Sequence, residues 1–129
     1  MERGKSQTDG GKHDQITGYH HPDSSTAAQT EDFTAQVAAD CLKFDLGLML
    51  ELLSYSLSDE KLTSDEKRYV VVETAHRLTL IAGVDILKAE FPLDLADDDP
   101  DCLAAACAEV SAVSVNLFEG YTYHRAALA

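Results

Sequence analysis

The sequence of 129 residues has no long run of apolar side chains. A membrane-spanning helix needs roughly 20 consecutive apolar residues, and no run reaches that length, so a membrane is not an expected partner. The first eleven residues also lack the apolar core that a secretory signal requires. We therefore expect a cytoplasmic location.

Basic residues are scarce. The chain has 10 Lys and Arg against 23 Asp and Glu, which gives a formal net charge of -13. Such a charge repels phosphate backbones unless a local basic patch overrides it, and the sequence has no such patch. Nucleic acid is not an expected partner.

Motifs for metals and nucleotides are also missing. The three cysteines, Cys41, Cys102 and Cys107, have no CxxC spacing, so they predict neither a disulfide framework nor a zinc site but reduced, mostly buried side chains. His20 and His21 with Asp23 carry ligand atoms, but adjacent side chains of an extended segment diverge, so no metal site is predicted. Neither GxGxxG nor GxxxxGK[ST] occurs, which removes the usual nucleotide-binding functions.

What the chain does contain is an alternation of helical and strand patterns. From Thr30 the apolar residues fall close to helical spacing, and residues 46–53, LGLMLELL, are typical of a buried strand. A second helix is expected over residues 64–82, with Ser64 as its N-cap, and a second strand over 84–91, closed by Pro92. A third helix is expected over 102–110. This order predicts an α/β fold with parallel strands.

Residues 1–18 are polar, contain glycine and show a period of neither 2 nor 3.6 residues. They predict a flexible or divergent N-terminal segment. The strand and helix patterns occupy residues 19–115, and residues 116–129 form a divergent tail.

Charged residues interrupt both predicted strands on one face. Side chains alternate across a strand, so Leu48, Leu50 and Leu52 share the helix-facing side of the first strand and Glu51 points away. In the second strand, Lys88 and Glu90 point away from the helices by the same rule. If the sheet curves as in a barrel, Glu51, Lys88 and Glu90 all lie in its interior.

These charges favour two hypotheses. A lysine enclosed by hydrophobic walls can lose its proton near neutral pH and attack a carbonyl carbon, with Glu51 or Glu90 as proton shuttle. The other hypothesis is a solvated or structural lysine at a strand end, in which Lys88 pairs with Glu51 without any catalysis.

Three motifs also resemble those of one family, the class I tagatose-1,6-bisphosphate aldolases, which include related aldolases for fructose and sulfofructose phosphates. "GVDILKAEFPLD" (83–94) resembles the strand that carries the Schiff-base lysine, and "LMLELLSYSL" (48–57) is similar to the glutamate-bearing strand. "YHHPDS" (19–24) resembles the end of the preceding strand. The resemblance covers about residues 19–115.

The resemblance implies a part of a (β/α)₈ barrel and a lyase that cleaves a ketose bisphosphate. Lys88 would form an imine with the substrate ketone, Glu51 would act as acid and base, and Glu90 would have a supporting role in substrate binding. The products would be dihydroxyacetone phosphate and glyceraldehyde 3-phosphate, with no metal or other cofactor. The partner is thus a phosphorylated sugar.

The chain also departs from the family. A complete barrel takes about 250 residues, so 129 residues supply roughly half of one, and both phosphate-binding loops of the family are missing. We expect a partial chain whose activity is weak or lost. A half barrel exposes two unpaired strand edges, so a homo-oligomer is a further expectation. The alternative is a noncatalytic α/β remnant or interaction module.

Overall fold

A computed structural model describes residues 2–4, 13–94 and 99–114 of the chain. The elements follow the order β1 (Glu2–Gly4), β2 (His13–Tyr19), α1 (Ala27–Lys43), β3 (Gly47–Leu53), α2 (Ser64–Thr79), β4 (Ile86–Leu87) and α3 (Pro100–Val113). From α1 onward, helices and strands alternate as the sequence predicts.

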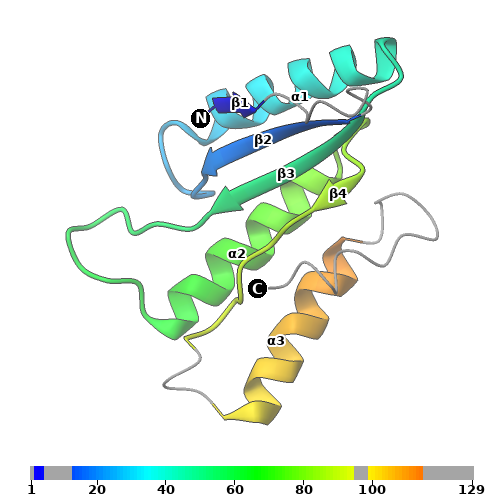
Figure 1. Ribbon diagram of the computed structural model, residues 1–129. Coiled ribbons are helices and arrows are strands. Elements are labelled where there is room, and N and C mark those ends of the chain that lie inside the picture. Colours follow the sequence, from blue (N-terminus) through cyan, green and yellow to red (C-terminus); the bar gives the residue numbers. More distant parts are fainter. Residues whose placement is uncertain (1, 5–12, 95–98, 115–129) are drawn as a thin grey trace.

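The strands form one four-stranded sheet in the order β1-β2-β3-β4 (Figure 1). β2, β3 and β4 are parallel, and β1 pairs with β2 in the antiparallel direction. The prediction of neighbouring parallel strands over residues 46–53 and 84–91 is therefore confirmed, although the second strand is only two residues long. The structure is a mixed α/β fold, and the described residues do not form a closed barrel.

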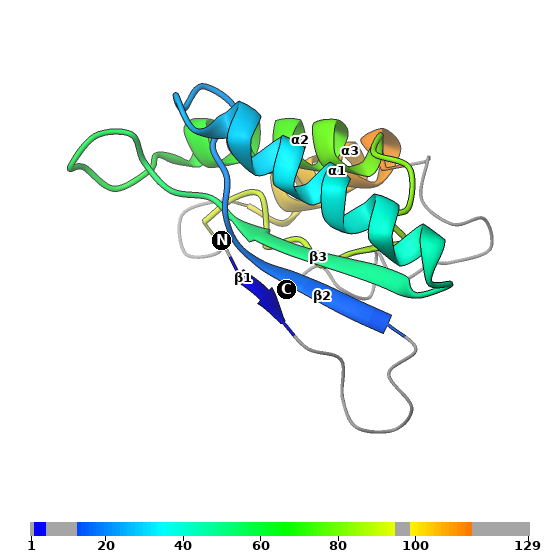
Figure 2. The ribbon, with the colours of Figure 1, turned by 90° about the horizontal axis from the view of Figure 1, so that it is seen from above.

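The helices α1, α2 and α3 lie on one side of the sheet (Figure 2). The residues of β3 alternate between partly exposed and buried, as expected, with three leucines buried against the helices. α1 and α2 supply most of the opposing side chains. The core contains Ile16, Leu48, Leu50, Leu52, Val37, Ala38, Cys41, Val71, Ala75 and Leu78.

The prediction of a flexible segment over residues 1–18 is wrong for residues 13–18. Residues 13–18 belong to β2, which pairs along its whole length with β3. Sequence analysis did not identify this strand because it has a single aliphatic side chain, Ile16, and one aromatic ring, Tyr19, at its end. Pairing with β3 supplies its backbone hydrogen bonds, and burial of Ile16 and Asp14 fixes which face points inward.

The helix ends differ from the prediction by small shifts. Thr63, not Ser64, is the N-cap of α2, and its hydroxyl accepts a hydrogen bond from the Glu66 amide. Asp99 caps α3 in the same way, with Pro100 at the first helical position. α1 begins at Ala27, three residues before the predicted start at Thr30.

A tight turn connects α2 to β4. Its Gly83 has a φ of +99°, and a Cβ added there would lie 2.7 Å from the carbonyl oxygen of Ala38 in α1. Glycine thus permits both the backbone conformation and the close approach of this turn to α1. Within the described part of the chain, no helix combines the length and the apolar character needed to cross a membrane.

Candidate functional site

Glu51 and Lys88 meet on the sheet face that points away from the helices. Leu50 of β3 is aligned with Leu87 of β4, so the next residues along the two strands are neighbours. The Nζ atom of Lys88 lies 3.1 Å from Oε2 of Glu51. The prediction that both side chains point to the same side is confirmed, and they form an ion pair at the carboxyl ends of adjacent parallel strands.

Solvent reaches this pair. The side chain of Lys88 is 48% exposed and that of Glu51 is 23% exposed. The expectation that hydrophobic walls enclose Lys88 is therefore wrong for the chain as described, since none of the described helices covers this face. The lysine is accessible to a small molecule in solution, and Glu51 is close enough to exchange a proton with it.

Side chains as well as main-chain groups hold β4 against β3 at both of its ends. At the beginning, the Leu48 amide donates to the Asp85 carboxylate at 2.9 Å instead of to a main-chain carbonyl. At the end, the Ser54 amide donates to the Glu90 carboxylate at 2.5 Å. These two carboxylates fix the position of the strand that carries Lys88.

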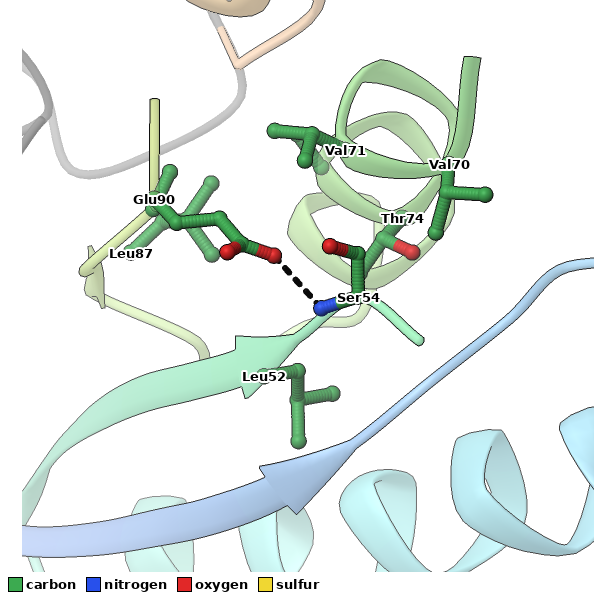
Figure 3. Close-up of a pocket in the computed structure, with 9 residues that line it drawn as sticks. Leu52, Ser54, Val70, Val71, Thr74, Leu87 and Glu90 are labelled. Carbon is green, nitrogen blue, oxygen red and sulfur yellow. Dashed lines mark hydrogen bonds between the residues drawn. The ribbon is translucent and has the colours of Figure 1, made fainter. Parts of the chain in front are cut away.

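Glu90 does not share a face with Lys88, so this part of the alternation prediction is wrong. Figure 3 shows its carboxylate pointing toward the Ser54 amide, in a pocket between the ends of β3 and β4 and helix α2. Lys67 of α2 is a second partner, with its Nζ atom 3.9 Å from Oε2. Regular alternation ends with β4 at Leu87, so the side chain of residue 90 does not have to follow it. The substrate-binding role of Glu90 stays a prediction.

β2 adds polar residues to the open face that sequence analysis missed. Thr17 is aligned with Glu51 in the parallel ladder, and Gln15 is aligned with Met49. The side-chain amide Nε2 of Gln15 donates to the Thr17 hydroxyl at 3.2 Å. A row of Thr17, Glu51 and Lys88 thus crosses three neighbouring strands. The weak strand pattern of residues 13–18 hid this arrangement.

The histidines of "YHHPDS" have protein partners. His20 is 2% exposed and lies between Thr74 of α2 and Glu31 of α1. The Nδ1 atom of His21 accepts a hydrogen bond from the Asp23 amide at 3.1 Å. Among the described residues, no three His, Cys, Asp or Glu side chains converge to hold a metal ion.

Of the three cysteines, only Cys41 is buried, so the expectation of mostly buried cysteines is wrong. Cys102 is exposed on α3, where its amide donates to the N-cap Asp99. Cys107 is partly buried, and that burial raises the pKa of its thiol, which disfavours the reactive thiolate.

Comparison with known proteins leaves the family open. No protein-family model matches the chain, and no curated protein matches it either. The resemblance to Schiff-base aldolases therefore rests on the three motifs alone and stays a prediction.

Proposed function

We propose that the chain carries the Schiff-base half of a class I aldolase, with Lys88 as the imine-forming amine and Glu51 as its acid and base. The observation that carries this proposal is the 3.1 Å contact between the two side chains on the open sheet face. The sequence resemblance implies complementary roles for these two residues.

The arrangement of the strands supports the related proposal of a partial (β/α)₈ barrel. β2, β3 and β4 are adjacent, parallel and in sequence order, and the helices lie on one side. Barrels use this arrangement and place catalytic groups at the carboxyl ends of the strands. Lys88 and Glu51 occupy such positions. The antiparallel β1 has no counterpart in a barrel and occupies the edge where a preceding parallel strand would pair.

The chemistry would proceed as follows. Glu51 accepts a proton from Lys88, and the neutral amine adds to the ketone carbon of the sugar to give a carbinolamine. Glu51 then donates the proton to the leaving hydroxyl, so that water departs and an imine forms. Glu51, now ionised again, then takes the proton from the hydroxyl group on the carbon that leaves as an aldehyde. The neighbouring C–C bond breaks, its electron pair moves to the protonated imine, the aldehyde is released, and an enamine remains. Protonation and hydrolysis of the enamine return the free lysine.

Reductive trapping tests this proposal. Incubation with dihydroxyacetone phosphate and borohydride should give a covalent adduct on Lys88, located by peptide mass spectrometry. Lys88→Arg should abolish it, since a guanidinium group does not form this imine. Cleavage of ketose bisphosphates by the isolated chain should be weak or absent, because loss of phosphate anchoring removes several kcal/mol of transition-state stabilisation.

Lys61 provides the matched control. It also pairs with a carboxylate, Asp94, at 3.3 Å, and its side chain is 85% exposed. Lys61→Arg should leave the labelling of Lys88 unchanged. If the adduct spreads evenly over the exposed lysines, with no preference for Lys88, the aldolase proposal is wrong.

A noncatalytic α/β module is the second candidate, and one observation favours it. Lys88 and Glu51 satisfy each other at a solvent-exposed position, which is a common structural arrangement of surface charges. This candidate predicts no preferential trapping at Lys88. The phosphorylated sugar belongs to the aldolase proposal alone, whereas a cytoplasmic location and a homo-oligomer are proposed under either candidate.

A further inference from the structure

A buried cluster of polar side chains joins three elements at the carboxyl end of β2. His20 follows β2 directly, and its Nδ1 atom lies 2.7 Å from the Thr74 hydroxyl of α2. Its Nε2 atom lies 3.2 Å from Oε2 of Glu31 in α1. The imidazole ring is thus the shared partner of both helices, at the same end of the sheet as Lys88.

The two contacts fit a neutral imidazole. Its Nε2–H donates to the Glu31 carboxylate, while Nδ1 accepts the hydroxyl proton of Thr74. A second proton would go to Nδ1, and the Thr74 hydroxyl would then have to turn its own proton elsewhere and accept from Nδ1–H instead. Protonation of His20 therefore reverses this hydrogen bond and places a positive charge on a ring that is fully buried.

Arg77 makes a charged His20 still less favourable. Its Nη1 atom lies 3.8 Å from Oε2 of Glu31, the same oxygen that faces His20. One carboxylate would then serve two cations, of which Arg77 is partly exposed but His20 is fully buried. Arg77 also donates to the Pro22 carbonyl at 3.2 Å, so the cluster holds the segment between β2 and α1 as well.

We propose that His20 is a pH-sensitive latch, which fastens α1 and α2 to the end of β2 while neutral and weakens when it is protonated. This inference does not depend on the aldolase proposal.

Burial and the surrounding charges favour the neutral form of His20 in the folded chain. Burial lowers the pKa of His20, and the hydrogen bond and negative charge of Glu31 only partly oppose that effect. Arg77 and His21 lower the pKa further. The neighbouring elements also carry more distant charged groups. On α2, the guanidinium of Arg77 donates to the Glu73 carboxylate, and before α1 the Asp23 carboxylate accepts a hydrogen bond from the Tyr69 hydroxyl.

The sign of the pH effect follows. The pKa of His20 is lower in the folded chain than the usual histidine value of about 6.5, so the unfolded chain binds the proton first. The latch contributes fully above about pH 6.5. Its contribution is lost progressively as the pH falls from there toward the lowered value.

The experiment measures urea unfolding of the full chain between pH 8 and pH 5. The wild-type midpoint should fall as the pH drops below about 6.5. His20→Gln keeps a donor and an acceptor but does not titrate, so its midpoint should change much less. His76→Gln is the matched control, because His76 lies exposed on the same helix as Thr74 and should leave the wild-type pH dependence unchanged.

A second measurement covers the case in which His20→Gln does not fold. The NMR titration of His20 in the wild-type chain should show a pKa below the usual histidine value of about 6.5, and amide exchange in α1 near Glu31 should accelerate as His20 titrates. An equal pH dependence in the wild type and His20→Gln would overturn the proposal. So would a His20 pKa at or above about 6.5.

Discussion

The two faces of the sheet place opposite demands on the same strands. On the helix side, Leu48, Leu50 and Leu52 of β3 are 5% exposed or less. On the open side, Met49, Glu51 and Leu53 are all partly exposed, although they alternate with those leucines along the chain. The first set is explained by burial of apolar surface. The second set includes a charge that packing does not require.

The comparison indicates that the helix-covered face stabilises the fold and that the open face is accessible to a substrate. Parallel sheets are normally covered on both faces, by helices or by closure into a barrel. Here the described helices cover only one. The open face keeps the row of Thr17, Glu51 and Lys88, in which polar groups of three strands lie side by side. We therefore expect substitutions on the helix side to change stability and substitutions on the open side to change function.

The largest expected effect comes from a deletion on the helix side. Leu50 is fully buried, so Leu50→Ala should lower the free energy of unfolding by about 3 kcal/mol, through lost burial and a cavity. Met49→Ala, one residue earlier and on the open face, should cost about 1 kcal/mol or less. Urea unfolding of both variants makes the comparison. Equal losses would mean that the open face is covered in solution.

An intermediate effect is expected at the turn before β4. Gly83→Ala places a Cβ against the Ala38 carbonyl and forces a positive φ on alanine, so it should cost about 2 kcal/mol. Gly47→Ala, at the start of β3, is the control and should be neutral or slightly stabilising. Thermal or urea unfolding distinguishes the two. A tolerated alanine at position 83 would show that α1 does not pack closely against this turn.

Sequence analysis predicted the parts of the fold with strong periodic patterns. The alternation in β3 predicted the correct inner and outer faces, and the helical spacing of Val71, Ala75 and Leu78 agrees with their burial on one side of α2. In α1, Val37 and Cys41 are buried, but Leu42 and Phe44 are exposed. These last two lie where the helix ends, so helical spacing no longer places them against the sheet.

The features that sequence analysis did not predict depend on contacts between residues that are distant in sequence. β2 is a strand because β3 pairs with it, and a sequence with one aliphatic residue does not reveal this. Glu90 leaves the face of Lys88 because the Ser54 amide, 36 residues earlier, attracts its carboxylate. By contrast, the contact between Glu51 and Lys88 was predictable, since both lie on or next to well-patterned strands.

The smallest expected effect concerns the ion pair on the open face. A double-mutant cycle with Glu51→Gln and Lys88→Met should give a coupling free energy below about 1 kcal/mol, because solvent reaches both side chains. The coupling should shrink further in concentrated salt. The measurement is urea unfolding of the four chains at low and high ionic strength. A coupling free energy of about 3 kcal/mol or more would mean that the pair is buried in solution. Its contribution to stability would then explain why the two charges are present. A small coupling, together with preferential trapping at Lys88, would mean that these two charges contribute to chemistry and hardly to the fold.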